Sequence, residues 1–133
     1  MEEFTYNDIT QPNRNKLLYQ VQGADGLKTG FTKESGWGIA ATALRNDRRI
    51  TVVINGTNSS RSRLNESSNL INWAFNQTSQ QTLVEKDQFI KEVDVWLGSE
   101  SSINLISAQK LGSTLSFDQI QLMNSSIEYT KPI

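Results

Sequence analysis

Between residues 37 and 54 the apolar residues follow the two-residue period of β-strands. Alternate positions of 37–44 carry the side chains that we expect on one face: Ile39, Ala41 and Ala43. The pair Asn46-Asp47 favours a turn, and the β-branched run 50–54 is typical of a strand buried on both faces. With the extended stretch 25–32 in front of them, these segments predict a three-stranded antiparallel meander.

Residues 64–75 change to the period of an α-helix. The predicted buried stripe consists of Leu64, Ser67, Ser68, Ile71, Ala74 and Phe75, and it is widened by Leu70 and Trp73. The polar loop 55–60 before it supplies candidates for the N-cap. We expect this helix to pack on the sheet.

The first residues of the chain are mostly polar and irregular. Residues 3–6 are predicted to be a short extended piece, and 17–19 to begin a second short strand. Residues 11–15 are predicted to be a loop, because Pro12 keeps the residue before it out of the helical region.

The second half of the chain returns to period two after a polar stretch at 78–81, where we place a domain boundary. Its alternating apolar residues are Val93, Val95, Leu97, Ile103, Leu105, Leu115, Phe117, Ile120, Leu122, Ile127 and Tyr129. Short strands at this spacing predict a small β-sandwich that is incomplete. The expected fold class is therefore α+β, with one domain over 1–78 and an all-β domain over 82–133.

The amino-acid composition restricts the possible chemistry more than it restricts the possible folds. The 133 residues carry a net charge of −1, which gives no electrostatic footprint for nucleic acid. Histidine and cysteine are absent, so thiol catalysis and thiolate zinc sites are excluded and acid-base work would fall to Lys, Asp, Glu or Tyr. Neither a membrane-spanning run nor a signal peptide is visible. We expect no metal and no cofactor.

The candidate chemistry lies in residues 25–32, with the sequence Asp-Gly-Leu-Lys-Thr-Gly-Phe-Thr. Gly26 and Gly30 have no side chain, so a ligand backbone can approach this strand closely. Lys28 and Thr29 leave a strand on opposite faces, so both can serve one cleft only if the strand is at a sheet edge.

This stretch, in its context, resembles the serine-type D-alanyl-D-alanine carboxypeptidases, the low-molecular-mass penicillin-binding proteins that trim peptidoglycan stem peptides. The resemblance covers residues 3–127. It is carried by Asn13-Arg14-Asn15 with Leu17-Leu18, by Asp25-Gly26-Leu27-Lys28-Thr29-Gly30, by the strand 36–44, by Arg61 and Arg63, by Trp73 and Phe75, and by Val95-Trp96 with Gly98. It implies a partial penicillin-binding or β-lactamase-like domain before the β-sandwich.

The family's mechanism is a serine acyl-enzyme mechanism, and the resemblance implies a role for several residues. Lys28, Thr29 and Gly30 would be the catalytic Lys-Thr-Gly motif. Substrate would be bound by Thr29, by the backbone N–H of Phe31 as an oxyanion donor, by Arg63 at the carboxylate and by Arg14 at the border of the cleft. The implied ligand is a stem peptide or a β-lactam, and the implied location is the periplasm or cell envelope.

The sequence also departs from the family pattern. No Ser-x-x-Lys or Ser-x-Asn lies before Lys28, where the family has its nucleophile and its proton relay. Similar spacings at Ser107–Lys110 and Ser67–Asn69 are in the wrong places, a predicted strand and the middle of the predicted helix. We therefore expect a C-terminal fragment of the catalytic domain that is inactive alone, whose partners are the missing N-terminal part and, through an exposed sheet edge, a second copy.

Three other interpretations stay open. One is a binding protein derived from this family that keeps affinity for wall peptides without catalysis. Another is a structural interaction module. The third is a glycosylated surface protein, suggested by the Asn-x-Ser/Thr matches at Asn55, Asn58, Asn65, Asn76 and Asn124.

Overall fold

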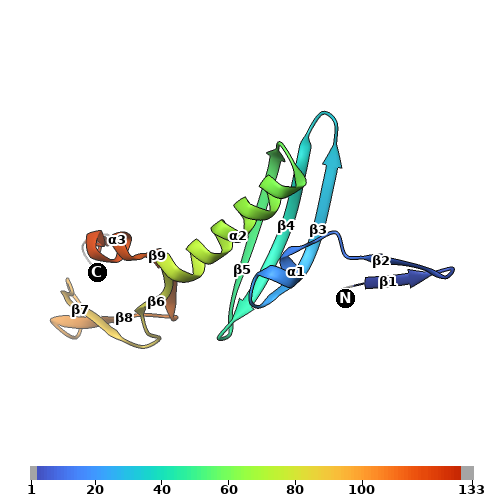
Figure 1. The fold of residues 1–133 in the computed structure, drawn as a ribbon. Coiled ribbons are helices and arrows are strands. Elements are labelled where there is room, and N and C mark those ends of the chain that lie inside the picture. Colours follow the sequence, from blue (N-terminus) through green and yellow to red (C-terminus); the bar gives the residue numbers. More distant parts are fainter. Residues whose placement is uncertain (1–2, 130–133) are drawn as a thin grey trace. The chain divides into compact units, whose positions relative to one another are not determined.

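The computed structural model describes residues 3–129 (Figure 1), and its backbone contacts divide the chain into two compact units on either side of the bond between Asn76 and Gln77. The fold class is confirmed: a three-stranded antiparallel sheet is followed by a helix and then by further small sheets. The assignment of 1–78 and 82–133 to two domains of stated type stays a prediction.

The first unit is built on the sheet β3-β4-β5, formed by Ala24–Thr32, Gly36–Arg45 and Arg48–Thr57. Both connections are short hairpins, as the sequence predicts. Asn46 and Asp47 have φ of 48° and 60°, the left-handed conformation that a two-residue hairpin turn requires and that Asn and Asp tolerate well. The predicted meander is confirmed, and β3 lies at one of its edges.

Strand β5 is not buried on both faces, so that prediction was wrong. Val52 is 6% exposed whereas its neighbour Val53 is 67% exposed. The difference arises because the helices of this unit pack on one face only, which leaves the Val53 side chain on the open face. The β-branched residues reflect strand propensity here rather than two-sided burial.

Helix α2 spans Ser60–Gln77 and confirms the predicted helix. The hydroxyl Oγ of Ser59 accepts a hydrogen bond of 3.0 Å from the backbone N–H of Ser62, so Ser59 caps the first turn. The helix packs on one face of the sheet in Figure 1, and the core contains Leu17, Val21, Ile39, Ala41, Ala43, Val52 and Ile71. Trp73, 52% exposed, lies outside this core, unlike the predicted stripe.

The N-terminal part contains the hairpin β1-β2, formed by Glu3–Tyr6 and Ile9–Pro12, and the short helix α1, Leu17–Gln20. The predicted extended piece at 3–6 is confirmed. The loop is shorter than predicted, because residues 11 and 12 pair in β2.

The second short strand predicted from residue 17 was wrong, because helix α1 lies there. The side-chain oxygen of Asn15 accepts a hydrogen bond of 3.2 Å from the backbone N–H of Leu17, which favours a helical turn. Leu17 and Val21, four residues apart, are both buried, as on one face of a helical turn.

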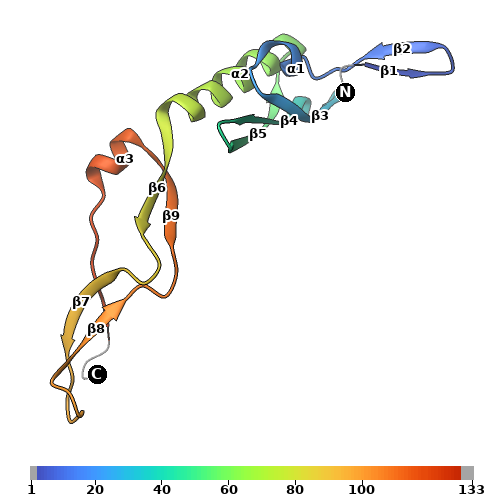
Figure 2. The ribbon, with the colours of Figure 1, turned by 90° about the horizontal axis from the view of Figure 1, so that it is seen from below.

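The second unit contains two antiparallel pairs, β6-β9 and β7-β8, both of which are drawn in Figure 2. The strands are β6 Thr78–Val84, β7 Phe89–Asp94, β8 Ser102–Ile106 and β9 Leu111–Ser116. The polar stretch 78–81, predicted to be an unpatterned boundary, belongs to β6 and pairs with β9. Its pairing uses backbone groups, so polar side chains do not prevent it.

Helix α3, Phe117–Leu122, replaces a strand that the alternation had predicted there. Ser116 and Gln119 form a reciprocal capping box: the Ser116 side chain accepts from the Gln119 backbone, and the Gln119 side chain accepts from the Ser116 backbone. The last predicted strand, at 127–129, is not regular structure.

Candidate functional site

The two faces of β3 separate the side chains of the Lys-Thr-Gly motif. Lys28 lies opposite Ala40, which in turn lies opposite Val53, on the open face of the sheet. Thr29 lies opposite Ile39, on the face that the helices cover. Because opposite residues of an antiparallel pair share a face, the lysine and threonine side chains lie on opposite faces of the same edge strand.

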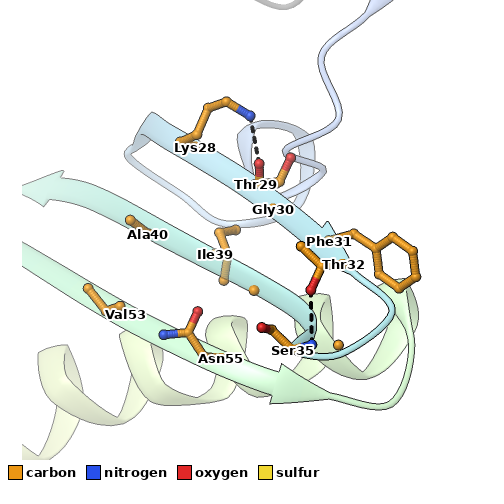
Figure 3. Close-up of a pocket in the computed structure, with 12 residues that line it drawn as sticks. Lys28, Thr29, Gly30, Phe31, Thr32, Ser35, Ile39, Ala40, Val53 and Asn55 are labelled. Carbon is orange, nitrogen blue, oxygen red and sulfur yellow. Dashed lines mark hydrogen bonds between the residues drawn. The ribbon is translucent and has the colours of Figure 1, made fainter.

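The hollow on the open face has a volume of about 340 Å³. Figure 3 shows the residues that line it, which include Lys28, Thr29, Gly30, Ser35, Ala40, Val53 and Asn55. The Nζ atom of Lys28 donates a hydrogen bond of 2.6 Å to the backbone oxygen of Thr29. Within residues 3–129 no carboxylate forms an ion pair with Lys28, so its charge is available to a ligand or to another segment.

A second hollow, of about 410 Å³, lies on the helix side of β3. It is lined by residues from three parts of the first unit: Pro12, Asn13, Arg14 and Lys16 from the loop before α1, Thr29, Gly30, Phe31 and Trp37 from β3 and β4, and Ser60 and Arg63 from α2. No Asp or Glu of the described chain lines it. We call this space the cationic hollow.

Arg63 is the buried cation of the cationic hollow, only 6% exposed. Its guanidinium donates to the backbone oxygens of Gly30 and Gly38 over 3.4 and 3.5 Å, and its carbon Cζ lies 5.4 Å from the centre of the Trp37 ring. These hydrogen bonds are long compared with the usual 2.9–3.0 Å. A third, of 3.4 Å, goes to the hydroxyl of Ser60.

Burial lowers the pKa of Arg63 from its ordinary value, because a low-dielectric surrounding disfavours the charged form. The guanidinium nevertheless remains charged at neutral pH, because arginine is effectively always protonated in proteins. In the described part of the chain no acid pairs with it. A buried cation with weak neutral partners is stabilised by an added anion, and its planar fork suits a carboxylate.

The loop that carries Arg14 and Lys16 is fixed by the residue between them. Asn15 is 2% exposed, and its amide Nδ2 donates a hydrogen bond of 3.0 Å to the backbone oxygen of Gly26 in β3. Its own backbone N–H donates to the side-chain oxygen of Asn13 over 2.8 Å. The two exposed cations therefore leave a backbone that is held against the Lys-Thr-Gly strand.

The structure brings most of the sequence-predicted site residues together at this edge of the sheet. Thr29, Gly30, Phe31, Arg14 and Arg63 all line the cationic hollow, whereas Lys28 lines only the hollow on the open face. Lys16, Trp37 and Ser60 also line the cationic hollow and were not among the predicted site residues. Lys16 comes directly after the Asn-Arg-Asn motif, and this position is the one sequence signal that could have identified Lys16 as a site residue.

Ser67 and Ser107, the serines of the two motif-like spacings, do not line either hollow beside the Lys-Thr-Gly strand. Ser67 is fully buried in the middle of α2, and its hydroxyl donates to the backbone oxygen of Arg63 at 2.7 Å. Ser107 belongs to the second unit, directly after β8 rather than within a strand as predicted. In residues 3–129 no group of three or more acidic side chains could hold a metal ion.

Asp25, at the start of β3, forms a bidentate ion pair with Arg49 of β5, with both N–O distances at 2.8 Å. The hydrogen bonds from Arg49 hold the pKa of Asp25 below its ordinary value of 3.8. The same pair raises the pKa of Arg49. The pair connects the two edge strands across β4, on the open face of the sheet.

We expect the stabilising effect of this pair to depend on pH in acid. A carboxyl group whose pKa is lower in the folded state stabilises that state above its unfolded pKa, and the effect is lost as the pH falls through the folded value. The difference in melting temperature between the wild type and Asp25→Asn should therefore shrink as the pH falls from about 5 to about 2. Thermal unfolding across that range measures it, with Glu34→Gln in the β3-β4 turn as the control; a constant difference would contradict the assignment.

Comparison with known proteins gives a consistent set of relatives. The family described as D-alanyl-D-alanine carboxypeptidase, peptidase S11, matches residues 1–58. The D-alanyl-D-alanine carboxypeptidase DacC of Escherichia coli is 35% identical over 98% of this chain. DacD of the same organism is 30% identical over 86%. The chain spans about a third of the length of these curated relatives, 33% and 30% respectively.

Solved structures agree with the sequence relatives. Penicillin-binding protein 5 of Haemophilus influenzae is 30% identical, with a TM-score of 0.70 over 91% of this chain and 36% of that one. The carboxypeptidase DacD of Francisella tularensis is 26% identical, with a TM-score of 0.77 over 92% of this chain and 30% of that one. Penicillin-binding protein D2 of Listeria monocytogenes, solved in its cefotaxime-bound form, is 30% identical, with a TM-score of 0.53 over 57% of this chain and 31% of that one.

Proposed function

The chain belongs to the D-alanyl-D-alanine carboxypeptidase family, the low-molecular-mass penicillin-binding proteins, and we propose that it provides the substrate-binding side of that family's active site. The observation that carries the proposal is the meeting of Thr29, Gly30 and Phe31 with the buried Arg63 around one hollow. A carboxylate is the ligand that such a hollow favours, and the substrate of this family ends in one.

We assign roles as follows. Arg63 binds the terminal carboxylate of a stem peptide or the carboxylate of a β-lactam, and the Thr29 hydroxyl donates to the same group. The backbone N–H of Phe31 is one oxyanion donor, which a phenylalanine provides as well as any other residue. Lys28 contributes positive charge from the other face of the strand, and Arg14 lies at the border.

The bond-breaking step needs a nucleophile that we assign to another segment. In the serine acyl-enzyme mechanism a serine oxygen attacks the carbonyl of the last peptide bond, the terminal D-alanine leaves with a proton, and water then hydrolyses the ester. A Ser-x-x-Lys and a Ser-x-Asn motif before Lys28 would supply that serine and its proton transfers, and the sequence has neither there. We propose that a segment carrying both motifs completes the site and covers an edge of the sheet. Without that segment, a second copy of the chain would pair with the same edge.

The first test measures chemistry by the chain alone. Incubated with a fluorescent penicillin and with a peptide ending in D-alanyl-D-alanine, the chain should form no covalent adduct and release no D-alanine, because its sequence has no Ser-x-x-Lys motif before Lys28. Mass spectrometry detects the adduct, and an amino-acid assay detects the release. An adduct or a steady release of D-alanine would disprove the assignment of the nucleophile to another segment.

A second candidate function is wall-peptide binding without catalysis. The buried Arg63 favours it as well, since binding a carboxylate needs no nucleophile. The two candidates differ when a segment bearing the missing motifs is added: the carboxypeptidase gains D-alanine release, whereas the binding protein does not.

The family suggests a location at the bacterial cell envelope, and we propose the periplasm or cell wall for this protein. Among the helices of residues 3–129, none combines the length and apolar character needed to cross a bilayer.

A further inference from the structure

The cationic hollow holds more positive charge than one carboxylate requires. The buried Arg63 lines it, and so do the exposed Arg14 and Lys16. No acidic residue lines the hollow, and within residues 3–129 none of the three cations has an ion pair. Three like charges around one space repel one another, so the arrangement stabilises bound anions and disfavours an empty hollow.

The hollow is also larger than one carboxylate. Its volume of about 410 Å³ is in the usual range for a small-molecule ligand. Phe31 and Trp37 lie side by side at it, with ring centres 4.4 Å apart. These rings provide an apolar surface for a ligand that reaches from Arg63 to the loop before α1.

Arg14 and Lys16 lie on a loop whose backbone is held in place, so they can form a fixed second binding position. Asn15 is fixed to β3 through its side chain, so the backbone on either side of it is ordered before any ligand arrives. A cation on a pre-ordered backbone loses less conformational entropy on binding than one on a free loop.

We propose that Lys16, with Arg14, forms a second anion-binding position, so that the cationic hollow selects peptides that carry a carboxylate in addition to the one at their D-alanine end. The inference rests on the proposed function, since Arg63 takes the terminal carboxylate. The ligand class is a D-alanyl-D-alanine peptide whose side chain ends in a second carboxylate. Lys16 is a specificity-determining residue here and takes no part in the reaction.

Two peptides that differ by one carboxylate test the proposal. Both are lysyl-D-alanyl-D-alanine with an acetylated α-amine; in one the side-chain amine is acetylated, and in the other it is succinylated. Calorimetric titration of the full chain at low salt should show the succinyl peptide binding about three-fold more tightly, the scale of a partly exposed ion pair. Salt at about 1 M, where the Debye length is about 3 Å, should remove that preference.

The variant Lys16→Gln should bring the ratio of the two affinities close to one, and Arg14→Gln should reduce it. Lys86→Gln, which removes an equal charge from the second unit, should leave both affinities unchanged. Equal affinity of the wild type for the two peptides would overturn this inference and leave the proposed function standing. Failure to bind either peptide would overturn both, and an unchanged ratio in Lys16→Gln would assign the preference to other residues.

Discussion

Replacing Arg63 with alanine should weaken binding of a D-alanyl-D-alanine peptide by at least about ten-fold, because a charged hydrogen-bonded pair contributes about 1.5–3 kcal/mol. The guanidinium is the one buried cation of the cationic hollow, and its present partners are long hydrogen bonds to backbone oxygens of β3 and β4 and to the Ser60 hydroxyl. A ligand carboxylate gives it a charged partner in a surrounding of low dielectric, which strengthens the interaction. Calorimetric titration with the diacetylated peptide measures the loss.

The neighbouring Arg61 provides the matched control. It lies in the same turn of α2, is exposed and does not line the hollow, so Arg61→Ala removes the same charge and should change the affinity little. Because Arg63 is buried, thermal unfolding of each variant must show that the fold persists. Thr29→Val is a second probe that leaves Arg63 in place and should also weaken binding. Unchanged affinity in both Arg63→Ala and Thr29→Val would disprove the assignment of the carboxylate site.

The parts of the fold that could be predicted are those in which one period continues over a whole element. The alternation in β4 and the helical stripe around Ile71 each extend over several turns or residues, and both elements lie where expected. Prediction failed where a local hydrogen bond outweighed the pattern. Asn15 starts a helix in front of Leu17, and the Ser116-Gln119 capping box turns an alternating segment into α3.

The site shows a similar division. Residues 25–32 pointed to the site because Lys-Thr-Gly lies within Asp-Gly-Leu-Lys-Thr-Gly and follows an Asn-Arg-Asn loop, the context that carries the family resemblance. Which residues share its hollow could not be read from the chain, since Arg63 is 33 positions from Gly30, to whose oxygen it donates a hydrogen bond. Sequence spacing also does not show that Thr29 lines the cationic hollow while Lys28 does not, which depends on which face of the sheet the helices cover.

The second large effect is expected at Gly23, between α1 and β3. Its φ is +77°, and a Cβ atom there would lie 2.2 Å from the backbone oxygen of Leu44. The backbone oxygen of Gly23 accepts a hydrogen bond of 2.9 Å from the N–H of Leu44, so the two backbone segments are held together and cannot separate freely. The left-handed conformation costs a non-glycine residue about 1–2 kcal/mol. Overpacking costs about 1–3 kcal/mol more.

Gly23→Ala should therefore lower the free energy of unfolding by about 2–5 kcal/mol, measured by urea denaturation. Two other glycines separate the causes. Gly56 has φ of +76° with open space around it, so Gly56→Ala should show the conformational cost alone; Gly30 has neither constraint, so Gly30→Ala should change stability least. Equal losses in Gly23→Ala and Gly56→Ala would show that the backbone near Leu44 yields to the new methyl group. A larger loss at Gly23 would instead show that the backbone contact between Gly23 and β4 is rigid. That contact fixes the start of β3, the strand that carries Thr29 to the cationic hollow.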